Sequence, residues 1–218
     1  MKLESVGILI SLRPFGERDS IARVFSYDFG LMSGLMRGAV VAKKNKPLVG
    51  QVGAVSWNAR LDSQLGAFHW DATRNMAAPL MMRADTLGLM NAAFALLDAL
   101  LPEREQNAAL YNATIEMLGA MAVGGDVREH YLQWEMELLR DLGYALDFSR
   151  CSGCGARENL NWISPRTGRA VCDDCAAPYK TRLYRMPADL HTTFEFISRA
   201  CAAQGADVPT ARRMICNI

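Results

Sequence analysis

The chain has 218 residues, of which 50% are hydrophobic and 22% are charged, and its formal net charge is +1. This composition excludes a chain that is disordered throughout, because it supplies enough apolar side chains to fill a core. No segment approaches the roughly 18 consecutive apolar residues of a transmembrane helix, and the first residues lack the apolar core of a signal peptide, so we expect a cytoplasmic protein without membrane contact.

The first part of the chain has the alternating pattern of β-strands. Apolar residues alternate between Val6 and Leu12, which predicts a strand with one buried face. Arg13-Pro14-Phe15-Gly16 predicts a turn after it, because proline cannot donate to a strand ladder. Further short segments rich in β-branched and aromatic residues predict four more strands, at 21–27, 31–36, 52–57 and 65–70, with a polar turn at 62–64. Five short strands in about 70 residues predict a small closed or partly open barrel.

After Pro79 the apolar residues recur at helical spacing. This predicts helices over 90–101, 110–121, 127–142 and 190–201, and a short terminal turn at 210–216. Their methionines and aromatic residues are expected to form the core of a helical bundle. Asp126 is expected to cap the third helix, whose exposed face is predicted to be acidic. The acidic residues assigned to that face are Glu129, Glu135, Glu137 and Asp141.

Charge is distributed unevenly along the chain. The net charge is +4 over residues 1–75, −6 over 76–150 and +3 over 151–218, and no acidic residue occurs between Asp28 and Asp62. A stretch of one sign can bind a polyanion although the whole chain is nearly neutral. The same pattern is typical of a solvated loop, which is the alternative interpretation. The basic residues of this stretch, our candidate contacts, are Arg37, Lys43, Lys44, Lys46 and Arg60.

The strongest chemical signal is a pair of Cys-x-x-Cys motifs with 17 residues between them. Each motif can turn both of its sulfur atoms toward one ion, and two motifs complete a tetrahedral shell. Thiolate ligands suit Zn²⁺, and four protein ligands leave no position for substrate, so we predict one structural zinc ion per chain. Residues 162–171 between the motifs predict a β-hairpin. The predicted ligands are Cys151, Cys154, Cys172 and Cys175.

Other functions of the cysteines, and catalysis, are less well supported. A redox pair needs one such motif beside a βαβ unit, which the pattern lacks, whereas an iron–sulfur cluster stays open on ligand type alone. The sequence contains no phosphate-binding loop motif, no dinucleotide-binding glycine motif and no zinc-protease motif. We therefore predict that the protein is not an enzyme.

Five phrases of the sequence, taken in order, carry a family resemblance. They lie at 7–10 with 13–17, at 29–34 with 37–39, at 100–105, at 139–147 with 151–155, and at 164–165 with 168. In this order and spacing they resemble the RecO family of bacterial recombination mediators, over essentially the whole chain.

The resemblance implies an α+β protein. A five-stranded OB-fold barrel would occupy 1–76, and an α-helical domain would occupy 77–218, with a zinc module at about 149–177. Members of the family bind single- and double-stranded DNA, anneal strands and engage single-stranded-DNA-binding protein. With RecR they help to load RecA on coated strands in gap and double-strand-break repair at the nucleoid. The alternatives are a zinc-ribbon adaptor that binds only proteins, and a nuclease, for which no site is visible.

For DNA binding, the basic residues named above would contact phosphates, and such contacts do not distinguish one base sequence from another. Trp57, Phe68 or Trp70 could stack on bases, although an aromatic residue of a small barrel more often belongs to its core. The resemblance further implies that the tail of single-stranded-DNA-binding protein docks on the helical domain, with Arg199 as a fallback position. Candidate arginines for this tail, each able to pair with a nearby acid instead, are Arg83, Arg104, Arg128, Arg140 and Arg150.

Overall fold

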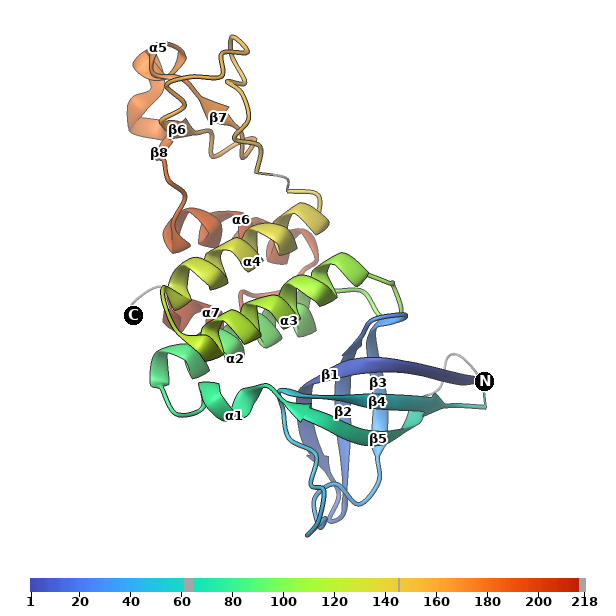
Figure 1. Ribbon diagram of the computed structural model, residues 1–218. Helices are drawn as coiled ribbons and strands as arrows, with labels where there is room; N and C mark the ends of the chain where they lie inside the picture. The colour runs from blue at the N-terminus through green and yellow to red at the C-terminus, as the bar shows by residue number, and fades with distance from the viewer. Residues whose placement is uncertain (61–64, 145, 216–218) are drawn as a thin grey trace. The chain divides into compact units, whose positions relative to one another are not determined.

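The computed structural model describes residues 1–60, 65–144 and 146–215 (Figure 1). The turn predicted at 62–64 and Cys216 lie outside the described residues. The architecture is α+β, as predicted, and its contacts divide it into two compact units. The first contains residues 1–127 and the C-terminal helix α7 (Thr210–Met214), and the second contains residues 128–208.

The first unit begins with a closed barrel whose strand order is β1-β2-β3-β5-β4. All neighbouring strands are antiparallel except β3 and β5, which pair in parallel. Leu9, Val24, Met32 and Trp57 fill its interior. The five predicted strands and the OB-like barrel are thus confirmed. The strands are β1 (Lys2–Phe15), β2 (Asp19–Ser26), β3 (Gly30–Met36), β4 (Gln51–Asn58) and β5 (Gly66–Asn75).

The turn predicted at 13–16 is wrong in position, because β1 continues through Pro14 to Phe15. Pro14 pairs with Ser20 of β2, and the turn follows at Gly16. The pairing of β1 with β4 ends at Ile8. Beyond that residue β1 has one neighbouring strand in the barrel instead of two, and an edge position tolerates the missing N–H of proline.

Helices of the first unit follow the barrel. Helix α3 begins where the Asn107 side chain accepts a hydrogen bond from the Leu110 N–H at 3.0 Å, and it ends at Gly124, whose φ is 107°. Met90, Met117 and Met121 are buried, which agrees with the predicted bundle core. The helices predicted over 90–101 and 110–121 are confirmed as parts of longer ones, except that Leu101 follows the end of α2. These helices are α1 (Ala77–Leu80), α2 (Ala84–Leu100) and α3 (Ala108–Val123).

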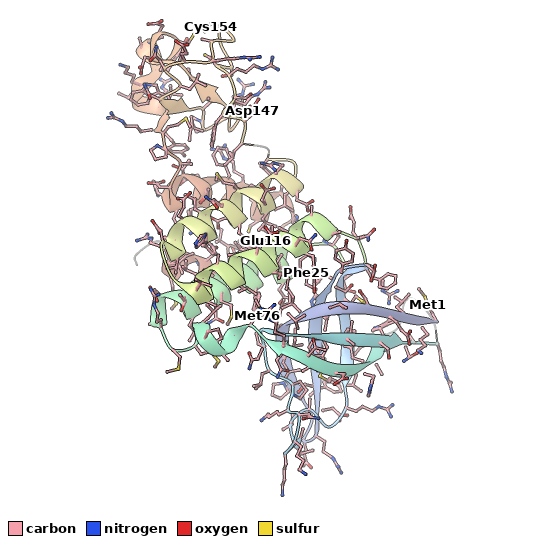
Figure 2. The ribbon with its side chains drawn as sticks, in the orientation of Figure 1. Met1, Phe25, Met76, Glu116, Asp147 and Cys154 are labelled. Atoms are coloured by element: carbon pink, nitrogen blue, oxygen red, sulfur yellow. The ribbon has the colours of Figure 1, made fainter. Side chains whose placement is uncertain are left out.

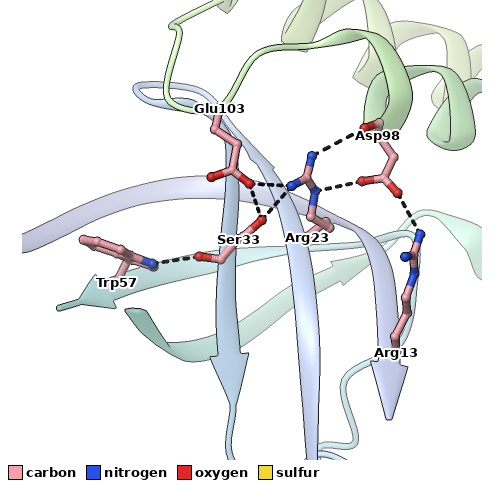
Figure 3. A network of polar contacts seen from close by, with 6 residues as sticks. All are labelled: Arg13, Arg23, Ser33, Trp57, Asp98 and Glu103. Atoms are coloured by element: carbon pink, nitrogen blue, oxygen red, sulfur yellow. Dashed lines mark hydrogen bonds and ion pairs between the residues drawn. The ribbon is translucent and has the colours of Figure 1, made fainter. Parts of the chain in front are cut away.

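Polar contacts join the barrel to α2 and to the loop that follows it (Figure 3). Arg23 of β2 lies between Asp98 of α2, at 2.7 Å, and Glu103 of the loop, at 2.5 Å. The Arg104 N–H donates to the Leu31 carbonyl at 2.9 Å, so the loop runs beside β3. Residues 1–127, which include α1–α3, belong to the same compact unit as the barrel. The domain boundary at 76/77 stays a prediction; it lies between the end of β5 and the start of α1.

The second unit contains two long helices and a small module. Helix α4 (Val127–Asp141) belongs to it from Arg128 onward, and α6 (Leu190–Ala203) follows later in the chain. The predicted hairpin is confirmed as β6 (Trp162–Ile163) and β7 (Ala170–Val171). A third strand, which the sequence analysis missed, pairs with β6. The remaining elements are α5 (Asp173–Ala176), the 3₁₀ helix η1 (Ala177–Arg182) and β8 (Tyr184–Arg185).

Glu135 corrects the predicted acidic face of α4. Its side chain is fully buried rather than exposed. It accepts hydrogen bonds from the Tyr131 hydroxyl at 3.1 Å and from the Thr193 hydroxyl of α6 at 2.5 Å. Glu135 follows Tyr131 by four residues and precedes Leu138 by three, so it lies on the same buried stripe. Hydroxyl donors to its carboxyl oxygens make burial of this polar group tolerable there.

Candidate metal centre and nucleic-acid interface

The two Cys-x-x-Cys turns bring four sulfur atoms together in the second unit; Cys154 is labelled in Figure 2. All four Sγ atoms lie within 4.8 Å of one another, and those of Cys154 and Cys172 are 3.6 Å apart. Four sulfur atoms at about 2.3 Å from one ion would be about 3.8 Å apart. The predicted ligands Cys151, Cys154, Cys172 and Cys175 are therefore arranged so that they can hold one metal ion.

Backbone N–H groups point at the Cys151 sulfur. Those of Gly153 and Cys172 each donate to it at 3.3 Å. A Cβ atom at position 153 would lie 3.0 Å from the Cys175 sulfur, so the tight turn favours glycine there. The Ser152 N–H donates to the Ala170 carbonyl at 2.8 Å and holds this turn against β7. The N–H groups of Gly153 and Cys172 stabilise negative charge on the Cys151 thiolate.

The environment separates the pKa values of the thiols. Burial raises the pKa of Cys151, but the N–H groups of Cys172, Cys154 and Gly153 outweigh it and bring the value to about 6. Hydrogen bonds among the thiols, first with Cys154 and then with Cys172, raise the pKa of Cys175 to about 12. The N–H of Cys175 lowers the pKa of Cys172, whereas burial and the thiols of Cys151 and Cys154 raise it, with a net increase. Without an ion, the cluster therefore keeps some of its protons near neutral pH.

The side chain of Asp173 stabilises the second cysteine turn through hydrogen bonds. Its carboxylate accepts hydrogen bonds from the Trp162 indole N–H at 2.8 Å and from the Asn161 amide at 2.7 Å. These two donors hold the pKa of Asp173 below its ordinary value, with smaller contributions from Lys180 and Arg185. Because Asp173 directly follows Cys172, the contacts tie that ligand to β6.

The candidate DNA contacts fall into two places. Arg37, Lys43, Lys44 and Lys46 are all exposed on the connection between β3 and β4, which we call the basic segment (residues 37–50). Arg60 is also exposed, but it follows the far end of β4. That strand has 8 residues, or about 26 Å of length. The structure therefore brings four of the five residues onto one segment and leaves Arg60 at the opposite end of the strand.

The basic segment is fixed to the barrel at several points. The Gly38 N–H donates to the Asp19 carboxylate at 2.8 Å, and the Val40 N–H donates to the Arg18 carbonyl at 3.0 Å. Ala39 between them is buried in the barrel core. The segment therefore lies against the turn between β1 and β2, with its lysines directed to solvent.

The aromatic candidates lie differently from the basic ones. Trp57 and Phe68 are buried in the barrel core, where the Trp57 indole N–H donates to the Ser33 carbonyl at 2.9 Å. Trp70 is half-buried against the same core. Phe15, which sequence reasoning overlooked, is 57% exposed and pairs with Asp19 beside the basic segment. Its position next to Gly16, in a predicted turn, was the available signal for an exposed ring.

Four of the five arginines proposed for partner docking interact with other residues of the protein, Arg128 among them. Arg83 pairs with Asp85 at 2.5 Å, and Arg140 pairs with Glu137 at 2.7 Å. Arg104 lies over the Trp57 ring, 4.2 Å from its centroid. These contacts correspond to the alternative in which such arginines serve structure, and the location of a docking pocket stays a prediction.

Fold and site together define a class: an α+β protein with an OB-like barrel, a helical part and a four-cysteine metal-site module. The family model "Recombination protein O N terminal" matches residues 1–70, and "Recombination protein O C terminal" matches residues 83–206. A DNA repair protein RecO from Cereibacter sphaeroides is 35% identical over 230 residues, covering 97% of this chain and 95% of the relative. One from Paracoccus denitrificans is 41% identical over 184 residues, covering 84% and 75%.

The chain therefore belongs to the RecO family of DNA repair and recombination mediators. This confirms the resemblance found in the sequence. In the part of the chain that the structure describes, no helix is both long enough and apolar enough to cross a bilayer.

Proposed function

We propose that this protein is a non-enzymatic recombination mediator that acts at the nucleoid in the cytoplasm. It binds single- and double-stranded DNA and anneals complementary strands. With RecR it helps to load RecA onto strands coated by single-stranded-DNA-binding protein. The observation that carries the proposal is the exposed, acid-free basic segment on an OB-like barrel in a chain of the RecO family. OB-type barrels bind single strands by combining a positive groove with stacking aromatic residues.

The direct test is an annealing assay on complementary strands coated with single-stranded-DNA-binding protein. The wild-type chain should accelerate annealing without nucleotide hydrolysis and without strand cleavage. A chain that anneals nothing, and binds no DNA at low salt, would favour the alternative of an adaptor that contacts only proteins.

Removing the charge of the basic segment should weaken DNA binding through its electrostatic part. In the variant Lys43→Gln/Lys44→Gln/Lys46→Gln we expect weaker single-strand binding by a similar factor for all sequences, because phosphate contacts carry no base information. Three lost contacts should reduce the slope of log affinity against log salt by about 2. The measurement is fluorescence anisotropy across a salt series. The matched control removes three exposed arginines of the second unit, Arg150, Arg157 and Arg182; if both variants change the slope equally, the binding surface lies elsewhere.

Phe15 is our candidate for base stacking. Phe15→Ala should weaken single-strand binding about tenfold, since one stacked base contributes about 1–3 kcal/mol, and should change duplex binding little. Leu48→Ala is the control, because Leu48 is an exposed apolar residue of the basic segment without a ring. Equal affinities of Phe15→Ala and wild type for single strands would remove Phe15 from the site.

We propose further that the ion of the cysteine site is Zn²⁺, one per chain, bound structurally. The supporting observation is the donor set of four sulfur atoms within 4.8 Å of one another. Thiolates suit this borderline-soft ion, and four of them leave no open coordination position. Zinc would hold the two turns together, while the N–H groups of Gly153 and Cys172 stabilise the Cys151 thiolate.

Metal affinity should fall steeply as the pH falls. At pH 7–8 Cys172 and Cys175, whose pKa values are raised, are protonated in the ion-free cluster, whereas Cys151 with a pKa of about 6 is already a thiolate. Binding therefore displaces at least two protons, so the affinity should rise at least about 100-fold per pH unit in this range. Below pH 6 Cys151 also binds a proton, and the dependence should become steeper. Competition with a chelator of known pH dependence measures this; a change of tenfold or less per unit would contradict it.

A further inference from the structure

A polar cavity of about 430 Å³ lies within the second unit, apart from the four cysteines. It is bounded by Gly143, Tyr144 and Asp147, which follow α4 in the chain, by the loop between β6 and β7, and by α6. Asp147 is labelled in Figure 2. Arginines from the other two walls line the cavity, namely Arg166, Arg169 and Arg199.

Two of these arginines are held in place by the protein. Arg199 donates from Nη1 to the Pro165 carbonyl and lies over the Phe196 ring, 5.4 Å from its centroid. Arg169 pairs with Asp147 at 3.4 Å. Guanidinium groups positioned in this way lose little conformational freedom when a ligand arrives.

The charges of the cavity do not cancel. Among the lining residues, three guanidinium groups face one carboxylate, that of Asp147, which leaves about two positive charges. Arg166 is exposed, and it makes no ion pair with any of the residues that the structure describes. Such a cavity attracts an anion, and planar guanidinium groups match the oxygens of a phosphate or carboxylate.

We propose that this cavity binds a phosphate group, which makes it a second anion site apart from the basic segment. Phosphate is favoured over the carboxylate end of a peptide for two reasons. A tetrahedral phosphate presents oxygens to several guanidinium groups at once. A peptide tail needs an open apolar wall, whereas Phe196 is 2% exposed and covered by Arg199. The inference rests on the proposed function only in naming a DNA strand as the expected source of the phosphate; a free phosphate compound has the same chemistry.

The test titrates the full-length, metal-loaded chain with inorganic phosphate while the arginine Nε–Hε resonances are followed by NMR. We expect Arg166→Gln to weaken phosphate binding at least about tenfold, the usual cost of losing a charged hydrogen bond. The matched control Arg157→Gln, an exposed arginine of the same unit outside the cavity, should change it less than twofold. Thermal unfolding checks that both variants fold.

Further measurements identify the molecule that supplies the phosphate and compare phosphate with a competing peptide ligand. If a 5′-phosphorylated thymidine dinucleotide displaces inorganic phosphate, the source is a DNA strand; if it does not, the cavity serves a free phosphate compound. The Lys43/Lys44/Lys46 variant should lose DNA affinity but keep phosphate binding. The proposal that the basic segment binds DNA and the proposal that this cavity binds phosphate can therefore be refuted independently. The proposal is overturned if phosphate shifts no cavity arginine, if Arg157→Gln acts like Arg166→Gln, or if an acidic peptide with an apolar C-terminal pair binds there more tightly than phosphate.

Discussion

Replacing Cys172 by serine is expected to release the metal and to unfold the segment from Cys151 to Cys175, while the barrel keeps its structure. The buried core of this module is small, with Val171 and Ala176 beside two of the cysteines. Its strands β6, β7 and β8 have two residues each. So little buried surface cannot offset the entropy of ordering the chain, whereas a structural zinc ion contributes on the order of 10 kcal/mol.

Segment-resolved hydrogen exchange, together with elemental analysis, measures this effect. Residues 151–175 should lose protection first, and β1–β5 should exchange as in the wild type. Cys201→Ser is the matched control, because Cys201 is a buried thiol of α6 outside the cluster; that variant should retain one metal ion. Wild-type protein without zinc, or with iron in its place, would refute the assignment of the ion.

Replacing Gly30 by alanine should be among the most destabilising single changes in the first unit. Gly30 begins β3 with a φ of 62°, a region that other residues rarely adopt. A Cβ atom there would lie 1.8 Å from the Glu105 carbonyl oxygen, in the loop between α2 and α3. The left-handed conformation costs about 1–2 kcal/mol, and moving backbone away from the new methyl group costs about 1–3 kcal/mol more. We expect a loss of roughly 2–5 kcal/mol in the free energy of unfolding.

Gly16→Ala provides a matched control. Gly16 has a similar φ of 70°, but no atom would lie within 4 Å of its added Cβ. This variant should lose only the conformational part, about 1–2 kcal/mol. Urea unfolding of both proteins, followed by near-ultraviolet circular dichroism, compares them. Equal losses would show that the approach of the α2–α3 loop to β3 contributes nothing to stability.

Local patterns in the sequence were sufficient where neighbouring residues decide the structure. Alternation predicted the first strand, and segments rich in β-branched and aromatic residues predicted the other four strands of the barrel. Helical spacing predicted the long helices, because burial of one face sets that period. The cysteine spacing predicted a cluster for a similar reason: each short turn brings two sulfur atoms together, and the hairpin between them closes the distance. The order and spacing of short phrases predicted the family, which the matches to its members confirm.

Tertiary structure decided what depends on distant residues. Glu135 is buried where the hydroxyl groups of Tyr131 and Thr193 donate hydrogen bonds to its carboxylate, and Thr193 is 58 residues away in the chain. In the sequence, Arg60 belongs to the same acid-free stretch as the lysines of the basic segment. In the structure, the whole length of β4 separates Arg60 from them.

The phosphate cavity and the barrel contacts also arise from long-range pairing. Arg199 meets Pro165 across 34 residues, and Arg23 meets Glu103 across 80. The sequence by itself thus predicted the barrel strands, the long helices, the metal-site candidates and the family. Only the fold decided which charged side chains are buried, paired or free to bind a ligand. The partner of a charged group is often distant in the chain, so the sequence around that group has no periodic pattern that would predict it.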